Sequence, residues 1–239
     1  MFKQTLIAVA LLAAGYANAA VPVTVSQWNF NSPIADATTS TGSIAASTGS
    51  GVASLVGMTS TFASGDVNGG SSDPASGDDS AWNLTGFATQ GTGDLTRGVQ
   101  FKMSTVGYQG VVFSYDLRHS NTSPMNETVQ YSLNGTDFVT GAQFAGNAGD
   151  AWFKGRTLDL TSITGANNNA DLTFRVLASF APGSGYVASK SGSTYGTTGT
   201  WRFDMVTTSA VTAVPEPETY AMLMAGLGLI GLARRRRQA

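Results

Sequence analysis

The sequence contains no cysteine, and its one histidine is His119. The absence of cysteine excludes disulfides, thiol nucleophiles and cysteine-ligated zinc. A zinc site built from several histidines is also excluded, because the chain has only one histidine. Any fold that this chain adopts must therefore be held together by its hydrophobic core or by a bound ion of another kind.

Charge is also scarce, because only 12% of the residues are charged, whereas 29 are glycine. Eight basic and thirteen acidic residues lie between Ala20 and Val214, which gives this span a net charge of −5. An acidic chain without clustered Lys or Arg is a poor ligand for phosphate backbones, so no nucleic acid partner is expected.

Residues that could support catalysis are few. No Gly-x-Ser-x-Gly elbow is present, and Glu127 is the only glutamate between Ala20 and Val214. His119 follows a predicted strand and is interpreted as an exposed residue at its end. We therefore expect a protein that is not an enzyme and has no catalytic set; a pair of converging aspartates that hydrolyses polysaccharide is the alternative.

The N-terminus has the order of a secretory leader. Lys3 provides a positive start, residues 6–14 are apolar, and Ala17-Asn18-Ala19 is a small-x-small cleavage signal. We predict a signal peptide over residues 1–19 with cleavage before Ala20, and hence an export translocon and a signal peptidase as partners. A buried N-terminal helix is the alternative interpretation.

The middle of the chain alternates apolar and polar residues with the period of half-buried strands. Clear examples are GVQFKMS at 98–104, VVFSYDLRH at 111–119, LTFRVLASF at 172–180 and TWRFDMV at 200–206. No convincing amphipathic helix is present, and Asn134-Gly135 predicts a tight hairpin turn. The pattern predicts an all-β fold for residues 20–213: an antiparallel β-sandwich of the jelly-roll type, with a closed barrel as the alternative.

The charged residues of these strands lie opposite the apolar residues. If the strands are neighbours, one sheet face carries Asp116, Arg118, Arg175, Arg202 and Asp204. Such a polar face could bind sugar hydroxyls or a uronic acid, because an Arg side chain grips a carboxylate at two points. A solvated ladder of salt bridges is the alternative.

Two further features favour ligand binding. The segment GDVNGGSSDPASGDD offers the hard oxygen ligands that calcium prefers, from Asp66, Asn68, Asp73, Asp78 and Asp79. Its spacing does not match an EF-hand, and local turns made by a solvated loop are the alternative. Trp82 and Trp152 lie beside Asp- and Gly-rich loops and are candidates for stacking on sugar rings.

The C-terminus begins with the extended linker Pro215-Glu216-Pro217, continues with the apolar residues 220–233, and ends in the cluster Arg234, Arg235, Arg236 and Arg237. Fourteen helical residues span about 21 Å, less than a hydrocarbon core of about 30 Å. The arginines would stay on the cytoplasmic side. We therefore expect the apolar segment to anchor the protein in the inner membrane only transiently.

This order of tripeptide, apolar helix and terminal arginines resembles the PEP-CTERM sorting signal, over residues 214–239. The resemblance implies that an exosortase recognises Pro215, Glu216 and Pro217, that Arg234–Arg237 act as the retention charge, and that the host is a Gram-negative bacterium that makes exopolysaccharide. It also implies that the cargo reaches the cell surface or the extracellular matrix. A plain tail anchor is the alternative.

A looser resemblance concerns the body. The Asp-x-Arg strand, the Tyr-Ser-x-Asn-Gly-Thr segment and the final Trp-Arg-Phe-Asp strand are similar to jelly-roll ectodomains that accompany this tail. The resemblance implies a galactose-binding-like sandwich, a fold often used for carbohydrate or calcium. We therefore expect a non-enzymatic surface or matrix protein associated with exopolysaccharide and biofilm; a secreted hydrolase or a purely structural matrix protein is the alternative.

Overall fold

The computed structural model describes residues 21–74, 77–213, 224, 226–228 and 230. The predicted signal peptide with Ala17, Ala19 and Ala20, and the sorting residues Pro215–Pro217 and Arg234–Arg237, lie outside the described residues. Within the described ranges, no helix is long and apolar enough to cross a bilayer.

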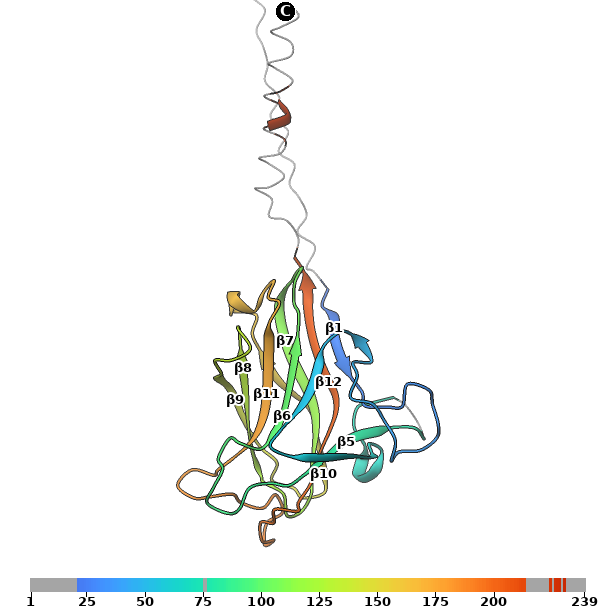
Figure 1. The fold of residues 1–239 in the computed structure, drawn as a ribbon, viewed down its shortest axis with the longest axis vertical. Helices are drawn as coiled ribbons and strands as arrows, with labels where there is room; N and C mark the ends of the chain where they lie inside the picture. The colour runs from blue at the N-terminus through green and yellow to red at the C-terminus, as the bar shows by residue number, and fades with distance from the viewer. Residues whose placement is uncertain (1–20, 75–76, 214–223, 225, 229, 231–239) are drawn as a thin grey trace, which may run out of the picture.

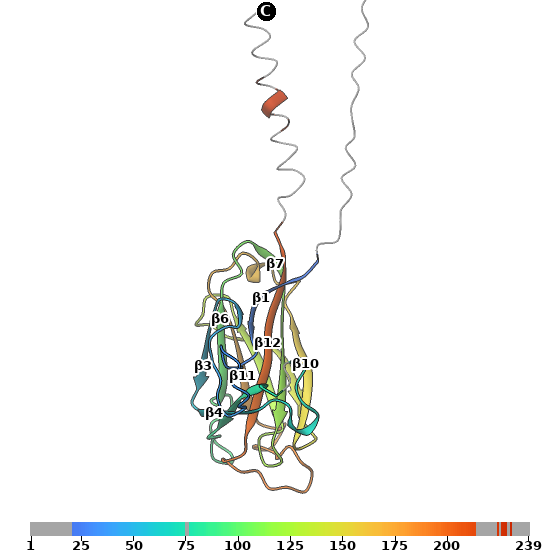
Figure 2. The same cartoon turned by 90° about the vertical axis from the view of Figure 1, so that its right-hand side faces the viewer.

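Two antiparallel sheets form the body, and Figures 1 and 2 show them as two layers. One sheet has the strand order β10-β7-β12-β1-β2, with β5 also paired to β12 and β4 paired to β5; the other has the order β3-β6-β11-β8-β9. The strands are β1 Val23–Trp28, β2 Thr48–Gly49, β3 Val52–Val56, β4 Thr59–Ser64, β5 Ser80–Thr85, β6 Gly98–Met103, β7 Tyr108–His119, β8 Asn126–Ser132, β9 Val139–Ala145, β10 Ala151–Asp159, β11 Leu172–Ser179 and β12 Trp201–Thr212.

The connections confirm the predicted jelly-roll sandwich. Most of the later connections cross between the sheets: β6, β8 and β11 belong to one sheet, and β7, β10 and β12 belong to the other. The pair β8 and β9 is an exception, because both strands lie in the same sheet. Such crossings are what closes two sheets over a shared core. Helical structure in the described chain is limited to the turns Val67–Gly69 and Thr164–Ala166 and a few residues near the C-terminus.

Aromatic side chains fill the space between the sheets. Phe113 of β7 stacks on Phe174 of β11 with ring centroids 4.2 Å apart, which joins the two layers at their centre. Trp28 and Trp201 are fully buried in the same core. Trp82 is 2% exposed, so its predicted role in stacking on a sugar is wrong, because β5 turns this side chain inward.

The predicted hairpin turn is longer than expected. The loop between β8 and β9 contains residues 133–138. Gly135 has the predicted positive φ of 79°. The Asn134 side-chain oxygen accepts backbone N–H groups from Thr136 and Asp137, which favours a wider turn than two residues would make.

The chain enters and leaves the sandwich at one pole. Figure 1 shows β1 beside β12. Val23 at the start of β1 pairs with Ala210 near the end of β12. At the other pole His119 ends β7 and lies between Trp201 of β12 and Ala151 of β10. The loops and side chains described below belong mainly to this second, distal pole.

Candidate metal centre

The structure brings together four of the five charged residues predicted to share one face. In the pairing of β7 with β12, Arg118 lies opposite Arg202 and Asp116 lies opposite Asp204. Arg175 belongs to β11 in the other sheet, so the five-residue face is wrong as one surface. Arg175 instead donates from Nε to Gln100 (2.8 Å) and lies 3.6 Å from the centroid of the Phe138 ring.

The four residues that remain together are covered by the chain from Ser64 onward. Asp116 accepts the backbone N–H of Ser72 (2.6 Å) on one oxygen and that of Gly155 (2.7 Å) on the other. Arg202 donates to the carbonyl of Ser64 at 2.9 Å. The face is therefore not an open platform for sugars, because its charged groups anchor the loops that lie over it.

Arg118 is also engaged, because its Nη2 lies 2.6 Å from Asp150. This ion pair offsets the unfavourable placement of two arginines at directly opposite positions on neighbouring strands. Burial, together with the charge of Arg118, lowers the pKa of Arg202.

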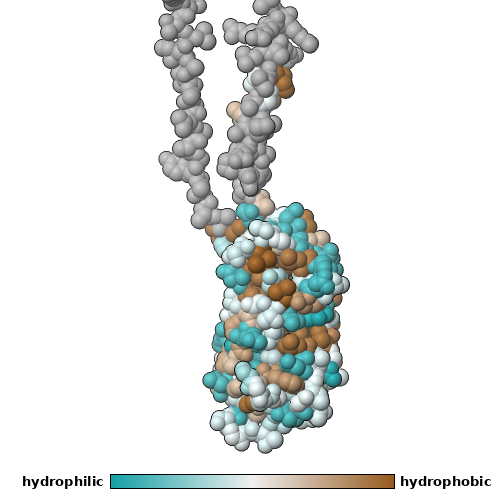
Figure 3. Space-filling view, turned by 90° about the vertical axis from the view of Figure 1, so that its left-hand side faces the viewer, coloured by the Kyte–Doolittle hydropathy of each residue, from teal (hydrophilic) through white to brown (hydrophobic). Residues whose placement is uncertain are grey.

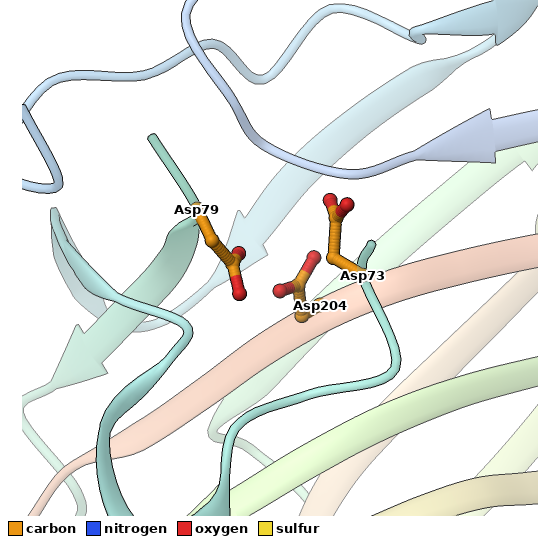
Figure 4. Close-up of side chains that lie close together, drawn as sticks. All are labelled: Asp73, Asp79 and Asp204. Carbon is orange, nitrogen blue, oxygen red and sulfur yellow. The ribbon is translucent and has the colours of Figure 1, made fainter. Parts of the chain in front are cut away.

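The covering loop brings carboxylates to β12. Asp73 and Asp79, both from the predicted calcium segment, meet Asp204, and one oxygen from each lies within 4.8 Å of the others. Figure 4 shows the carboxylates of Asp79 and Asp204 facing each other, with Asp73 beside Asp204. We call Asp73, Asp79 and Asp204 the aspartate cluster.

The other three residues of the predicted calcium segment lie elsewhere. Asp66 and Asn68 are exposed around the short turn Val67–Gly69. Asp78 accepts the backbone N–H groups of Asp36 and Thr38 at 3.3 Å, so it fixes an N-terminal loop. Two residues of the predicted calcium segment therefore lie in the aspartate cluster. Its third member, Asp204, was assigned to the charged face instead, because 125 positions along the chain separate it from Asp79.

Burial makes the cluster electrostatically costly. Asp204 is fully buried and Asp79 is 1% exposed. Within the described chain, Oδ2 of Asp204 and Oδ1 of Asp79 accept no hydrogen bond from an N–H or hydroxyl group, and the two carboxyl groups hydrogen-bond to each other when one of them carries a proton. Burial raises the pKa of Asp204 to about 9, helped by the neighbouring charge of Asp79, and burial raises the pKa of Asp79 to about 6.

The arrangement matches the needs of a hard divalent cation. Buried carboxylates this close cannot all ionise without a positive charge among them. Calcium binds oxygen at about 2.3–2.6 Å, so oxygens on opposite sides of one ion lie up to about 5 Å apart. The separations in the aspartate cluster fall within this limit, and its two orphaned oxygens are available as ligands.

A second buried cluster lies between the sheets. Glu127 of β8 is fully buried, and its Oε1 lies 2.6 Å from Nε of Arg156. Oε2 of Glu127 lies 3.9 Å from Nε2 of His119. Burial raises the pKa of Glu127 to about 8, against the opposing effect of the Arg156 charge.

His119 is part of this interior cluster, so its predicted exposed position is wrong. The ring is fully buried and lies edge-on to Phe153 and Trp201. Its Nδ1 lies 2.8 Å from the carbonyl of Pro124 and is assigned as the donor, which leaves Nε2 unprotonated toward Glu127. Burial lowers the pKa of His119 to about 3, so the imidazole is neutral and works as a packing group.

Comparison with known proteins identifies the C-terminal segment. Residues 213–237 match the family model of the PEP-CTERM protein-sorting motif. The chain therefore carries the sorting signal of exported proteins that are processed by exosortase, and this signal is a C-terminal membrane anchor. No curated protein matches the chain.

Solved structures resemble the sandwich only distantly. One is the tandem CBM22 domain of Paenibacillus barcinonensis Xyn10C, with 13% identity and a TM-score of 0.45 over 87% of this chain and 53% of that one. Another is the CBM22-1–GH10 part of Clostridium thermocellum xylanase 10B in complex with xylohexaose, with 11% identity and a TM-score of 0.43 over 66% of this chain and 26% of that one. A CBM4 module has 15% identity and a TM-score of 0.38 over 67% of this chain and 86% of that one. At these values the likeness identifies neither a ligand nor a reaction.

Proposed function

We propose that this protein is a non-enzymatic component of the cell surface or extracellular matrix of a Gram-negative bacterium, where it associates with exopolysaccharide in biofilm. The observation that carries the proposal is the sorting motif at residues 213–237, which begins directly after β12 ends at Thr212. The sandwich is therefore the cargo that the sorting signal delivers.

In this proposal each end of the chain has a separate task. Residues 1–19 direct the chain to the export translocon and are removed by signal peptidase, which leaves Ala20 as the first residue. The apolar segment then holds the protein transiently in the inner membrane, with Arg234–Arg237 on the cytoplasmic side. Exosortase recognises Pro215-Glu216-Pro217 and releases the sandwich.

The mass of the protein outside the cell tests this pathway. In a host with exosortase, we expect a species that lacks residues 1–19 and the apolar segment with its arginines. Replacing Pro215, Glu216 and Pro217 by alanine should leave the tail uncut and the protein in the membrane fraction. Recovery of the unprocessed chain from the cytosol, or normal release of the triple variant, would contradict the proposed sorting.

The proposal includes one calcium ion, held by the aspartate cluster. It is supported by the oxygen-only ligand set, by the two orphaned carboxylate oxygens and by their burial beside a third carboxylate. The ion would neutralise the cluster and fasten the covering loop to β12. Because no disulfide can stabilise this exported sandwich, such an ion has a clear structural purpose.

A further inference from the structure

The open edge of the sandwich between β9 and β10 contains a groove of about 560 Å³, distinct from the aspartate cluster. The groove is shallow and widely open to solvent, so a ligand would lie along it rather than inside it. Figure 3 shows one side of the molecule, on which apolar patches alternate with polar ones. The groove is lined by Phe144, Trp152, Phe153, Lys154, Gly155, Arg156 and Thr157.

A bulge in β10 gives the groove its charged groups. The pairing of β10 with β7 shifts register between Phe153 and Arg156, and Gly155 has φ of +64°. This conformation suits glycine, and Asp116 fixes it by accepting the Gly155 N–H. As a result Lys154 is exposed, whereas Arg156 turns toward Glu127 between the sheets.

The aromatic rings of the groove are held in place by their neighbours. The guanidinium of Arg156 lies 4.8 Å from the Phe144 centroid and 4.6 Å from the Phe153 centroid, between the two rings. The indole N–H of Trp152 donates to the carbonyl of Val67 at 2.9 Å. All three rings are half-buried, so each keeps part of an apolar face accessible at little further cost in ordering.

The charge of the groove is positive although the sandwich as a whole is acidic. Its lining residues include two cations, Lys154 and Arg156, and no acidic residue. Lys154 donates to the carbonyl of Gly69 at 3.2 Å and is otherwise turned to solvent. Part of the Arg156 charge is balanced by Glu127, so Lys154 is the main accessible charge for a ligand.

We infer that this groove binds an acidic polysaccharide that carries uronate carboxylates. The inference rests on the proposed association with exopolysaccharide and adds the chemical class and the site. The rings offer apolar faces to sugar rings, and Lys154 attracts a carboxylate. β9 and β10 are both edge strands, so backbone groups at this edge that no side chain already engages can bind sugar hydroxyls. The Ala145 carbonyl and the Gly155 N–H are not among them, because Arg156 and Asp116 bind them.

A binding titration of the full-length protein in mild detergent tests the inference, with polygalacturonate as the acidic probe and dextran as the neutral one. We expect saturable binding of polygalacturonate that weakens about tenfold or more between about 50 and 500 mM salt, because exposed charges are screened. Dextran should bind at least tenfold more weakly. Lys154→Gln and Trp152→Ala should each weaken binding of polygalacturonate about five- to tenfold.

The matched control is Lys190→Gln, which removes the same charge from an exposed lysine that does not line the groove. It should leave the affinity within twofold. Because Lys154 is exposed, its substitution keeps the fold, which circular dichroism verifies. If both groove variants keep the wild-type affinity for polygalacturonate, the groove is not the binding site. The proposed association with polysaccharide would not be affected by that result. Preference for dextran would overturn the acidic class, and no binding of either polymer would overturn the inference. If neither the wild type nor the groove variants bind the host's own exopolysaccharide, the proposed association with exopolysaccharide fails as well.

Discussion

Calcium should raise the melting temperature of the chelated protein by about 5–10 °C when its concentration is about a hundredfold above the dissociation constant. Such an excess contributes about 2.7 kcal/mol to the free energy of unfolding. A domain of this size gains about 2–4 °C for each kcal/mol. The physical cause is that the ion replaces the repulsion among Asp73, Asp79 and Asp204 with attraction to a positive charge. Scanning calorimetry with and without a chelator measures the shift.

Substitution within the aspartate cluster separates specific binding from a general salt effect. Asp204→Asn removes a buried ligand and should abolish the calcium-dependent shift. Asp66→Asn makes the same chemical change at an exposed position of the predicted calcium segment, outside the cluster, and should keep the shift. If wild type, Asp66→Asn and Asp204→Asn all gain the same stability from calcium, the ion binds elsewhere and the proposed centre is wrong.

Arg156→Met should destabilise the protein more at high pH than at low pH. Burial gives Glu127 a folded-state pKa of about 8, above the ordinary value of 4.5. A raised pKa means that the contribution of Glu127 to stability is complete below about pH 4.5 and is lost as the pH rises through 8. Without the charge of Arg156 the pKa of Glu127 rises further. The free energy of unfolding of the variant therefore drops further below that of wild type at pH values above about 8, where wild-type Glu127 is ionised.

At pH 9 we expect Arg156→Met to cost about 1.4 kcal/mol more than at pH 5, because the variant must keep Glu127 protonated about one pH unit above its wild-type pKa of about 8. At pH 5 Glu127 is protonated, and we expect a loss of about 1–2 kcal/mol from the two ring contacts of Arg156 and its bond to the Ala145 carbonyl. Urea unfolding at both pH values measures the difference. The double variant Arg156→Met with Glu127→Gln serves as the control, and its loss in free energy of unfolding should be the same at pH 5 and pH 9. If the loss of the single variant Arg156→Met does not change with pH, this account is wrong.

The sequence was sufficient to predict the strands whose side chains alternate clearly. The periods around Phe113, Phe174 and Phe203 led to the sandwich, because each strand has one apolar face toward a shared core. β4 and β9 were missed, since TSTFAS and VTGAQFA are short and weakly alternating edge segments. Pairing between strands was not predictable, and this is why Arg175 was assigned to the wrong sheet.

The candidate sites show the same limit. Local composition indicated Asp73 and Asp79 as metal ligands, but the third member of the cluster comes from a distant strand. Nothing in the pattern around His119 or Glu127 distinguishes an exposed strand end from an interior pair, because only the fold places Arg156 beside them. Long-range juxtaposition, rather than residue type, was the missing information in each case.

The pairing of the first strand of the sandwich with its last one determines how the sandwich would be presented. A protein held or attached through its C-terminus is held at the pole where Val23 meets Ala210. The far pole, where Ala151 pairs with His119 and where β10 begins its groove, then projects outward from the anchor. A layer of such molecules would therefore present the same distal pole, with the beginning of β10, to its surroundings.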